Sequence, residues 1–110
     1  MDREELIKLI QTKEIIGVDL SGQKLEKIDF SGCRIERTSF KGCEMTHCRF
    51  RNAKISWSDF RYAEIQHGTF EGAEIEFSDF YRAFIDGVVI FSGSQFSNCS
   101  LNKTYLGECA

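Results

Sequence analysis

The sequence of 110 residues contains no proline, only one tryptophan, and no apolar run long enough to cross a bilayer. The absence of proline suits a structure in which most backbone N–H groups donate hydrogen bonds, because proline lacks that donor. No nucleophile stands beside a base, and no glycine-rich phosphate loop follows a strand. We therefore expect a non-enzymatic protein that uses no cofactor and does not insert into a membrane.

Charged residues of both signs are interleaved along the chain. The 17 acidic and 14 basic residues give a formal net charge of −3. Proteins that bind nucleic acid directly usually carry a basic stripe, which an acidic balance with mixed signs does not provide. We expect no direct contact with nucleic acid.

Large apolar residues recur at every fifth position through most of the chain. The register comprises Leu20, Leu25, Phe30, Ile35, Phe40, Met45, Phe50, Ile55, Phe60, Ile65, Phe70, Ile75, Phe80 and Ile85. A helix would spread a five-residue step around its cylinder, and a strand would send successive members to opposite faces. The period therefore belongs to a repeat that is larger than one helix or strand.

A small residue stands two positions before most of these centres. The small slot holds Cys33, Thr38, Cys43, Cys48, Ala53, Ser58, Ala63, Gly68, Ala73, Ser78 and Ala83. With this second rule the chain resembles the pentapeptide-repeat family over about Ile15 to Gly107. The resemblance implies an all-β fold, a right-handed quadrilateral parallel β-helix in which each pentapeptide forms one side of a coil and the centre and small residues point inward.

Stacking the centres coil upon coil predicts two aromatic ladders that face each other across the interior. One ladder should contain Phe40, Phe60 and Phe80, and the other Phe30, Phe50 and Phe70. Each buried Phe or Ile contributes roughly 1.5 to 3 kcal/mol, so this core needs neither metal nor disulfide. Residues that accept a positive φ are expected at the corners, namely Gly22, Gly32, Gly42, Asn52 and Gly72.

The register slips by one residue near the end of the repeats, because Phe96, Leu101 and Leu106 are out of phase with Ile85. We place a one-residue bulge near Gly87-Val88, which makes Phe91 the next centre. The alternative makes Ile90 the centre and moves the bulge to Ser92-Gly93-Ser94. An insertion of this kind can also be tolerated without any function.

The first residues follow a helical pattern. Leu6, Ile7, Leu9 and Ile10 are spaced for one apolar helix face. Asp2 with Glu5 resembles a capping box, and together these features predict a helix from Arg3 to about Thr12. Its apolar face would cover the open first coil, as terminal repeats require. The expected organisation is a capping helix over residues 1–14, a β-helix over 15–107 and a short tail over 108–110.

Four of the five cysteines fall in small inward slots, at Cys33, Cys43, Cys48 and Cys99. A thiol in such a slot is a compact apolar group, so we interpret these cysteines as structural. A disulfide between Cys43 and Cys48 is the alternative, although adjacent sides of a coil need not orient the side chains for it. Free thiols favour a cytoplasmic location.

Two histidines, His47 and His67, are one coil apart and should stack on an outer face, flanked by Glu44 and Glu64. A weak surface metal site is one interpretation. A solvated ladder of side chains is the other, and we expect no metal.

Outward-facing aromatic residues are confined to the second half of the chain. Trp57 and Phe77 occupy equivalent positions one coil apart, and the others on neighbouring sides are Tyr62, Tyr81 and Phe84. A concentration of exposed aromatic residues is typical of a protein-interaction surface, for a partner that the sequence does not identify. The alternative is a ladder that only stabilises neighbouring coils.

The C-terminal coil is expected to self-associate. After its inward residues Phe91, Phe96, Leu101 and Leu106, only four residues follow, too few for an amphipathic cap. A homodimer that buries this end would be closed and symmetric, with Tyr105 and Phe84 near the seam and Cys109 close to the axis. The resemblance points the same way. The alternative is a tail that folds back over its own coil.

The sequence thus predicts a self-associating protein-interaction scaffold. The resemblance also raises an alternative, mimicry of DNA by an acidic rod that protects or inhibits DNA gyrase. Asp19, Asp59 and Asp79 align for such a role, but Lys41, Arg61 and Arg82 are expected beside them.

Overall fold

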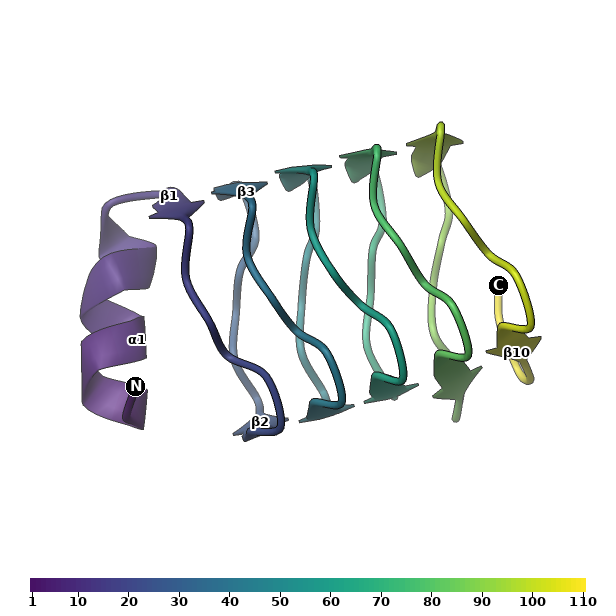
Figure 1. The fold of residues 1–110 in the computed structure, drawn as a ribbon, viewed down its shortest axis with the longest axis horizontal. Helices are drawn as coiled ribbons and strands as arrows, with labels where there is room; N and C mark the ends of the chain where they lie inside the picture. Colours follow the sequence, from purple (N-terminus) through teal and green to yellow (C-terminus); the bar gives the residue numbers. More distant parts are fainter.

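The computed structural model describes residues 1–110, as one helix followed by a parallel β-solenoid of about five turns. Figure 1 shows the helix covering the first coil at one end and the C-terminus at the other. Residues Arg3–Gln11 form α1. The strands are β1 Glu14–Ile16, β2 Lys24–Glu26, β3 Arg34–Glu36, β4 Glu44–Thr46, β5 Lys54–Ser56, β6 Glu64–Gln66, β7 Glu74–Glu76, β8 Phe84–Asp86, β9 Gln95–Ser97 and β10 Tyr105–Leu106.

The strands form two parallel sheets on opposite sides of the solenoid (Figure 1). One has the order β1-β3-β5-β7-β9 and the other β10-β8-β6-β4-β2. Equivalent centres pair directly, as Ile15 with Ile35 and Met45 with Ile65. The predicted all-β solenoid with inward centres is confirmed.

The two sides that carry the phenylalanine centres are not strands. They are joined from coil to coil by single bridges, such as Ser39 with Asp59. On these sides the carbonyl of the centre accepts a hydrogen bond from the residue three positions on, as Phe40 does from Cys43 at 3.0 Å. That tight turn removes the extended backbone that a strand requires, so only two of the four sides build continuous sheets.

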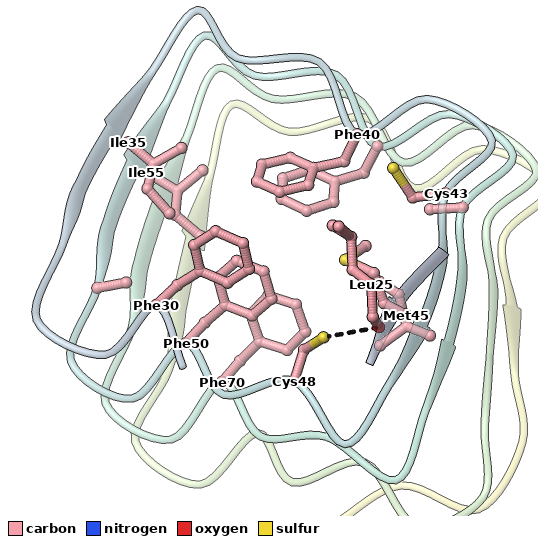
Figure 2. Close-up of a cluster of buried hydrophobic side chains, with 14 of the residues drawn as sticks. Leu25, Phe30, Ile35, Phe40, Cys43, Met45, Cys48, Phe50, Ile55 and Phe70 are labelled. Atoms are coloured by element: carbon pink, nitrogen blue, oxygen red, sulfur yellow. Dashed lines mark hydrogen bonds between the residues drawn. The ribbon is translucent and has the colours of Figure 1, made fainter. Parts of the chain in front are cut away.

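The interior consists of stacked side chains, as Figure 2 shows for Phe30, Phe50 and Phe70. Successive rings in that ladder lie 4.7 and 4.8 Å apart. In the opposite ladder, Phe40, Phe60 and Phe80 are separated by 4.7 and 4.6 Å. Rings meet edge to face across the core, as Phe30 meets Phe40 at 87°. Both predicted ladders are confirmed, and their geometry is the one that aromatic quadrupoles favour.

From the first coil to Leu101, each centre is followed two positions later by a corner residue with positive φ. The five corner residues expected from the sequence have this conformation, with φ from 58° at Asn52 to 73° at Gly22. The sequence analysis missed a second set of corners, where bulky residues take the left-handed conformation. Trp57 has a φ of 53° and Phe77 one of 49°. Glycine is therefore preferred at these corners but not required.

The register slip lies where the sequence predicts it. Thr69 bridges Ile90, and the ring of Phe91 stacks on that of Phe70 at 5.4 Å. The His67 N–H donates to the carbonyl of Gly87, and both Gly87 and Val88 have positive φ, 72° and 60°. The extra residue therefore belongs to the Gly87-Val88 corner, and the alternative bulge at Ser92-Gly93-Ser94 is wrong.

Helix α1 begins with the predicted capping box. Asp2 Oδ1 accepts from the Glu5 N–H at 2.9 Å, and Glu5 Oε1 accepts from the Asp2 N–H. Leu6 is 1% exposed against the first coil. Ile7, expected on the same apolar face, is instead 40% exposed, because the helix directs Leu6 rather than Ile7 at the coil. The helix is anchored by Arg3, which donates to the carbonyl of Glu26 at 2.7 Å.

The last coil has the sparsest packing of the solenoid. Phe91 and Phe96 are half-buried, whereas Leu101 and Leu106 are 45% and 54% exposed. Residues 108–110, which were expected to be a tail, continue the backbone pairing between coils. Cys109 forms a β-bridge with Val89, and the carbonyl of Ala110 accepts a hydrogen bond from the Phe91 N–H. They extend one side of the solenoid and leave the two leucines uncovered. The only helix, α1, is too short to traverse a lipid bilayer.

Candidate functional site

The outward aromatic residues form three separate ring pairs. Trp57 stacks on Phe77 with ring centroids 4.6 Å apart and 6° between planes. Tyr62 meets Tyr81 edge to face at 5.8 Å, and Phe84 stacks on Tyr105 at 4.7 Å. The stacking expected for Trp57 and Phe77 is confirmed. The pairs belong to different sides of the solenoid, so the aromatic surface is a band of three pairs rather than one continuous patch.

Exposure differs among these rings. Trp57 is 60% exposed and Phe77 is 42% exposed, so a flat apolar surface faces solvent at this corner. Tyr81 is half-buried, and its hydroxyl accepts a hydrogen bond from Arg82 Nε at 3.0 Å. The Trp57–Phe77 pair is therefore the most accessible part of the band.

Of the aligned aspartates Asp19, Asp59 and Asp79, the middle one, Asp59, is neutralised by a neighbouring arginine. Asp59 receives two hydrogen bonds from Arg61, at 2.9 Å from Nε and 2.8 Å from Nη2. The carboxyl of Asp59 is partly buried, which raises its pKa, but the Arg61 hydrogen bonds and charge outweigh this effect and hold the pKa below its usual value. The aligned aspartates thus do not present the unbroken row of negative charge that a DNA duplex carries.

The two histidines stack as the sequence predicts, with ring centroids 5.1 Å apart and 17° between planes. The structure brings together no group of three or more His, Cys, Asp or Glu side chains in an arrangement that could hold a metal ion. The pair instead lines a hollow of about 360 Å³ together with Lys27, Arg49 and Thr69. The sequence analysis missed this grouping. The twenty-residue spacing that aligns Lys27, His47 and His67 was the signal that could have found it.

The buried cysteines act as weak hydrogen-bond donors between coils. Cys43 Sγ–H donates to the carbonyl of Leu20 at 3.0 Å, and Cys48 Sγ–H to that of Leu25 at 3.2 Å (Figure 2). Burial raises the pKa of Cys43 to about 11 and also raises the pKa of Cys33 and Cys48. All five cysteines are free, and of these only Cys109 is exposed. The thiols are therefore structural groups with little nucleophilic character.

A parallel solenoid with stacked core side chains and outward aromatic pairs defines the class of β-solenoid repeat scaffolds. A family model described as a pentapeptide repeat region matches residues 14–90. The chain belongs to the pentapeptide-repeat family. Proteins of this family are generally non-enzymatic structural or interaction proteins.

Solved structures show the same fold. HetL, a pentapeptide repeat protein involved in heterocyst differentiation regulation from the cyanobacterium Nostoc sp. strain PCC 7120, superposes with a TM-score of 0.77 and 14% identity. The match covers 84% of this chain but only 44% of HetL, so this chain spans less than half the length of that relative.

Two other structures are more distant. A pentapeptide repeat protein from the thylakoid lumen of Arabidopsis thaliana has 25% identity and a TM-score of 0.37, over 74% of this chain and 61% of that one. QnrB1, a plasmid-mediated fluoroquinolone resistance protein, has 16% identity and a TM-score of 0.29, over 82% of this chain and 56% of QnrB1. A search among curated proteins gives no match.

Proposed function

We propose that the chain is a non-enzymatic interaction scaffold that pairs with a second copy of itself through the C-terminal coil. The observation that carries this proposal is the contrast between the two ends of the solenoid. At the N-terminal end, Leu6 of α1 is 1% exposed, whereas at the opposite end Leu101 and Leu106 are 45% and 54% exposed. Apolar centres exposed beside unpaired strand edges favour association.

The geometry of the last coil suits a twofold contact. Strands β9 and β10 are the outermost members of their sheets, and the stacked rings of Phe84 and Tyr105 lie beside Leu106. A twofold axis through this end would bring the same leucines and rings of both copies together and close the assembly. The half-buried Phe91 and Phe96 would then complete the shared core.

Light scattering tests self-association. We expect the chain at tens of micromolar to have the mass of a dimer, and changing both Leu101 and Leu106 to Glu to give a monomer. The matched control is Ile16→Glu, at a residue 42% exposed near the other end, which should remain dimeric. A monomeric mass for the unmodified chain would refute the proposal, and so would an N-terminal variant that dissociates as readily as the leucine variant.

The part of the aromatic band outside the dimer contact, the Trp57–Phe77 and Tyr62–Tyr81 pairs, is the surface that we propose for a different protein partner. Trp57 and Phe77 give this band its most exposed ring pair, and aromatic side chains commonly supply most of the binding energy of an interface. Replacing both with Ser should abolish capture of that partner while the dimer persists, since Leu101 and Leu106 are left unchanged. Capture that survives this replacement would leave the pair with only a stabilising role.

No observation favours DNA mimicry directed at gyrase. The Asp59–Arg61 pair interrupts the acidic row, and Arg82 lies over the ring of Tyr81 at 5.5 Å, where it adds positive charge to the same region. The mixed surface favours protein contacts over imitation of a polyanion.

A further inference from the structure

One corner of the solenoid collects hydrogen-bond donors that have no partner within the chain. Lys27, His47 and His67 stand two residues after successive centres on the β2-β4-β6 side, and Arg49 and Thr69 belong to the adjoining side. Together they line the hollow of about 360 Å³. This corner is different from the corner that carries Trp57 and Phe77, so the site is independent of the aromatic band.

The charged side chains of this hollow are unpaired. The salt bridges of the molecule are made by Lys24, Arg34 and Arg61. Neither Lys27, Arg49 nor the two imidazoles takes part in a salt bridge or donates a side-chain hydrogen bond. Four donor side chains that hydrogen-bond to no acceptor of the chain therefore surround one hollow, an arrangement that suits an anion.

A buried hydroxyl adds a fifth donor. Thr69 is 6% exposed, and its Oγ1 accepts a hydrogen bond from the Glu71 N–H at 3.0 Å. Because a hydroxyl can donate as well as accept, its proton is available to a ligand. Next to it lies Gly68, where an added Cβ would come within 2.7 Å of the carbonyl oxygen of Cys48. Glycine is therefore required where this coil packs against the backbone of Cys48, and the backbone of Gly68 lines the hollow between His67 and Thr69.

The single acid of the hollow fixes where the anion lies. Asp29 belongs to the coil of Lys27, and its Oδ1 accepts from the Ser31 N–H at 2.9 Å. Asp29 would repel a second anion at its own end. Arg49 bridges Asp29 in the next coil and Thr69 in the coil after it. The negative group of a ligand is therefore expected beyond Arg49 as seen from Asp29, near His67 and Thr69, two coils or roughly 10 Å from Asp29 along the axis, with Arg49 reaching it from the coil between.

A second hollow adjoins the first, and its helix side is lined by apolar side chains rather than by hydrogen-bond donors. It has a volume of about 260 Å³, shares Lys27, Ile28 and Asp29 with the first, and is closed on the other side by Ile7 and Ile10 of α1. Ile7 is 40% exposed there. The two hollows thus form one groove that is apolar beside the helix and rich in hydrogen-bond donors further along the solenoid.

We propose that this groove binds a small organic phosphate. Its phosphate group accepts hydrogen bonds from Arg49, His67 and Thr69, and its apolar part packs against Ile7, Ile10 and Ile28. A phosphate suits the site because it offers several acceptor oxygens to donors arriving from two sides of the coil. The apolar hollow selects phosphates that carry a short hydrocarbon group over inorganic phosphate.

The test titrates the folded chain with hexyl phosphate, inorganic phosphate and hexanol, and follows the imidazole proton signals of His47 and His67 by NMR. We expect hexyl phosphate to bind about tenfold more tightly than inorganic phosphate, since burial of even two methylenes gives a gain of that order. Hexanol should bind far more weakly than hexyl phosphate. Equal affinities for hexanol and hexyl phosphate, or unmoved imidazole signals, would overturn the proposal.

Variants separate the two halves of the groove. Arg49→Gln and His67→Gln should each weaken both phosphates about tenfold, whereas Ile7→Ser should reduce hexyl phosphate to the affinity of inorganic phosphate and leave the latter unchanged. Arg51→Gln is the matched control, because Arg51 is exposed on the same side as Arg49 but does not line the hollow. If Arg51→Gln weakened phosphate binding as much as Arg49→Gln does, the binding would depend only on diffuse charge attraction, which would contradict the proposal.

A last arm separates a soluble phosphate from a lipid headgroup. When vesicles that contain phosphatidic acid are sedimented, the protein should stay in solution. The groove is lined from two sides of the coil, so it accommodates one short hydrocarbon group rather than the surface of a bilayer. Sedimentation with these vesicles, together with no response to hexyl phosphate, would contradict the proposal.

Discussion

Phe91 lies parallel to Phe70, with ring centroids 5.4 Å apart and 6° between the ring planes, although the chain between them is one residue longer than between Phe50 and Phe70. The ladder of rings is kept in register by the Gly87-Val88 corner, where two consecutive residues have positive φ. The core thus sets the alignment of the coils, and the exposed corner accommodates the extra residue.

The corner at Val88 is strained, which a substitution can relieve. Val88 is β-branched, 53% exposed and held at a φ of 60°, a conformation that such residues rarely adopt. We expect Val88→Gly to raise the free energy of unfolding by about 1 kcal/mol. Chemical denaturation measures the change. Val88→Ala, which removes only the branching, should give a smaller gain, and a loss of stability in the glycine variant would contradict this account.

The inner and outer ring stacks should differ sharply in their contribution to stability. Phe60 is fully buried between Phe40 and Phe80, so Phe60→Ala should lower the free energy of unfolding by about 3–5 kcal/mol. Phe77 stacks on Trp57 but is 42% exposed, so Phe77→Ala should cost about 1 kcal/mol or less. Denaturant titration compares the two variants, and equal losses would show that the outer stack is part of the structural core.

The cysteines should differ in their reactivity. Burial raises the pKa of Cys43 to about 11 and raises that of Cys48 as well, whereas Cys109 is exposed. In the folded chain, a thiol reagent should modify Cys109 first, and Cys33, Cys43 and Cys48 only when denaturant unfolds the solenoid. Mass spectrometry after a timed reaction identifies the modified residues. Rapid labelling of Cys43 under native conditions would show that the coils open locally.

The last coil should loosen at acidic pH. Asp86 Oδ1 accepts from the N–H groups of Glu108 at 2.9 Å and Gly87 at 2.8 Å, and these bonds hold the pKa of Asp86 below its usual value. A carboxyl with a lowered folded pKa contributes stability that is present above its unfolded pKa, near 3.9, and is lost as the pH falls through the folded pKa.

Hydrogen exchange at the Glu108 amide measures this effect. Exchange should accelerate, after correction for intrinsic rates, as the pH falls below about 4. Asp86→Asn should already give faster exchange at neutral pH and should weaken the pH dependence. Asp19→Asn is the control at the other end of the solenoid and should leave the Glu108 amide unchanged. A Glu108 amide insensitive to Asp86→Asn would contradict the prediction.

Much of the fold could be predicted from the sequence because the solenoid repeats its contacts. A residue such as Phe50 meets its own equivalents, Phe30 and Phe70, in the neighbouring coils, so a period in the sequence becomes a column in space. The same reasoning correctly placed the stacks of Trp57 on Phe77 and His47 on His67. It also placed the capping box of α1, which depends only on local spacing.

The sites were less predictable because they depend on contacts between different columns. The period does not say that Lys27 and Arg49, on adjoining sides, line one hollow with the histidines. Nor does it say that Ile7 lies partly exposed beside a hollow rather than packed into the first coil, since that depends on how α1 lies against the coil. The separation of the aromatic residues into three pairs has the same origin, because Trp57 and Phe77 stand at corners of the coil, whereas Phe84 and Tyr105 pair within strands on another side.

By itself the sequence determined which residues point inward and how the coils stack, because burial of a centre at every fifth position aligns equivalent residues in columns. The tertiary structure decided between the two positions open to the register slip, since the ring of Phe91 stacks on that of Phe70. The tertiary structure decided which sides become strands, since the turn that closes on Phe40 and its equivalents competes with extended backbone. It also decided which surfaces are hollow or exposed. Hollows and exposed surfaces depend on contacts between the side chains of neighbouring columns, and the five-residue period of the sequence does not encode those contacts.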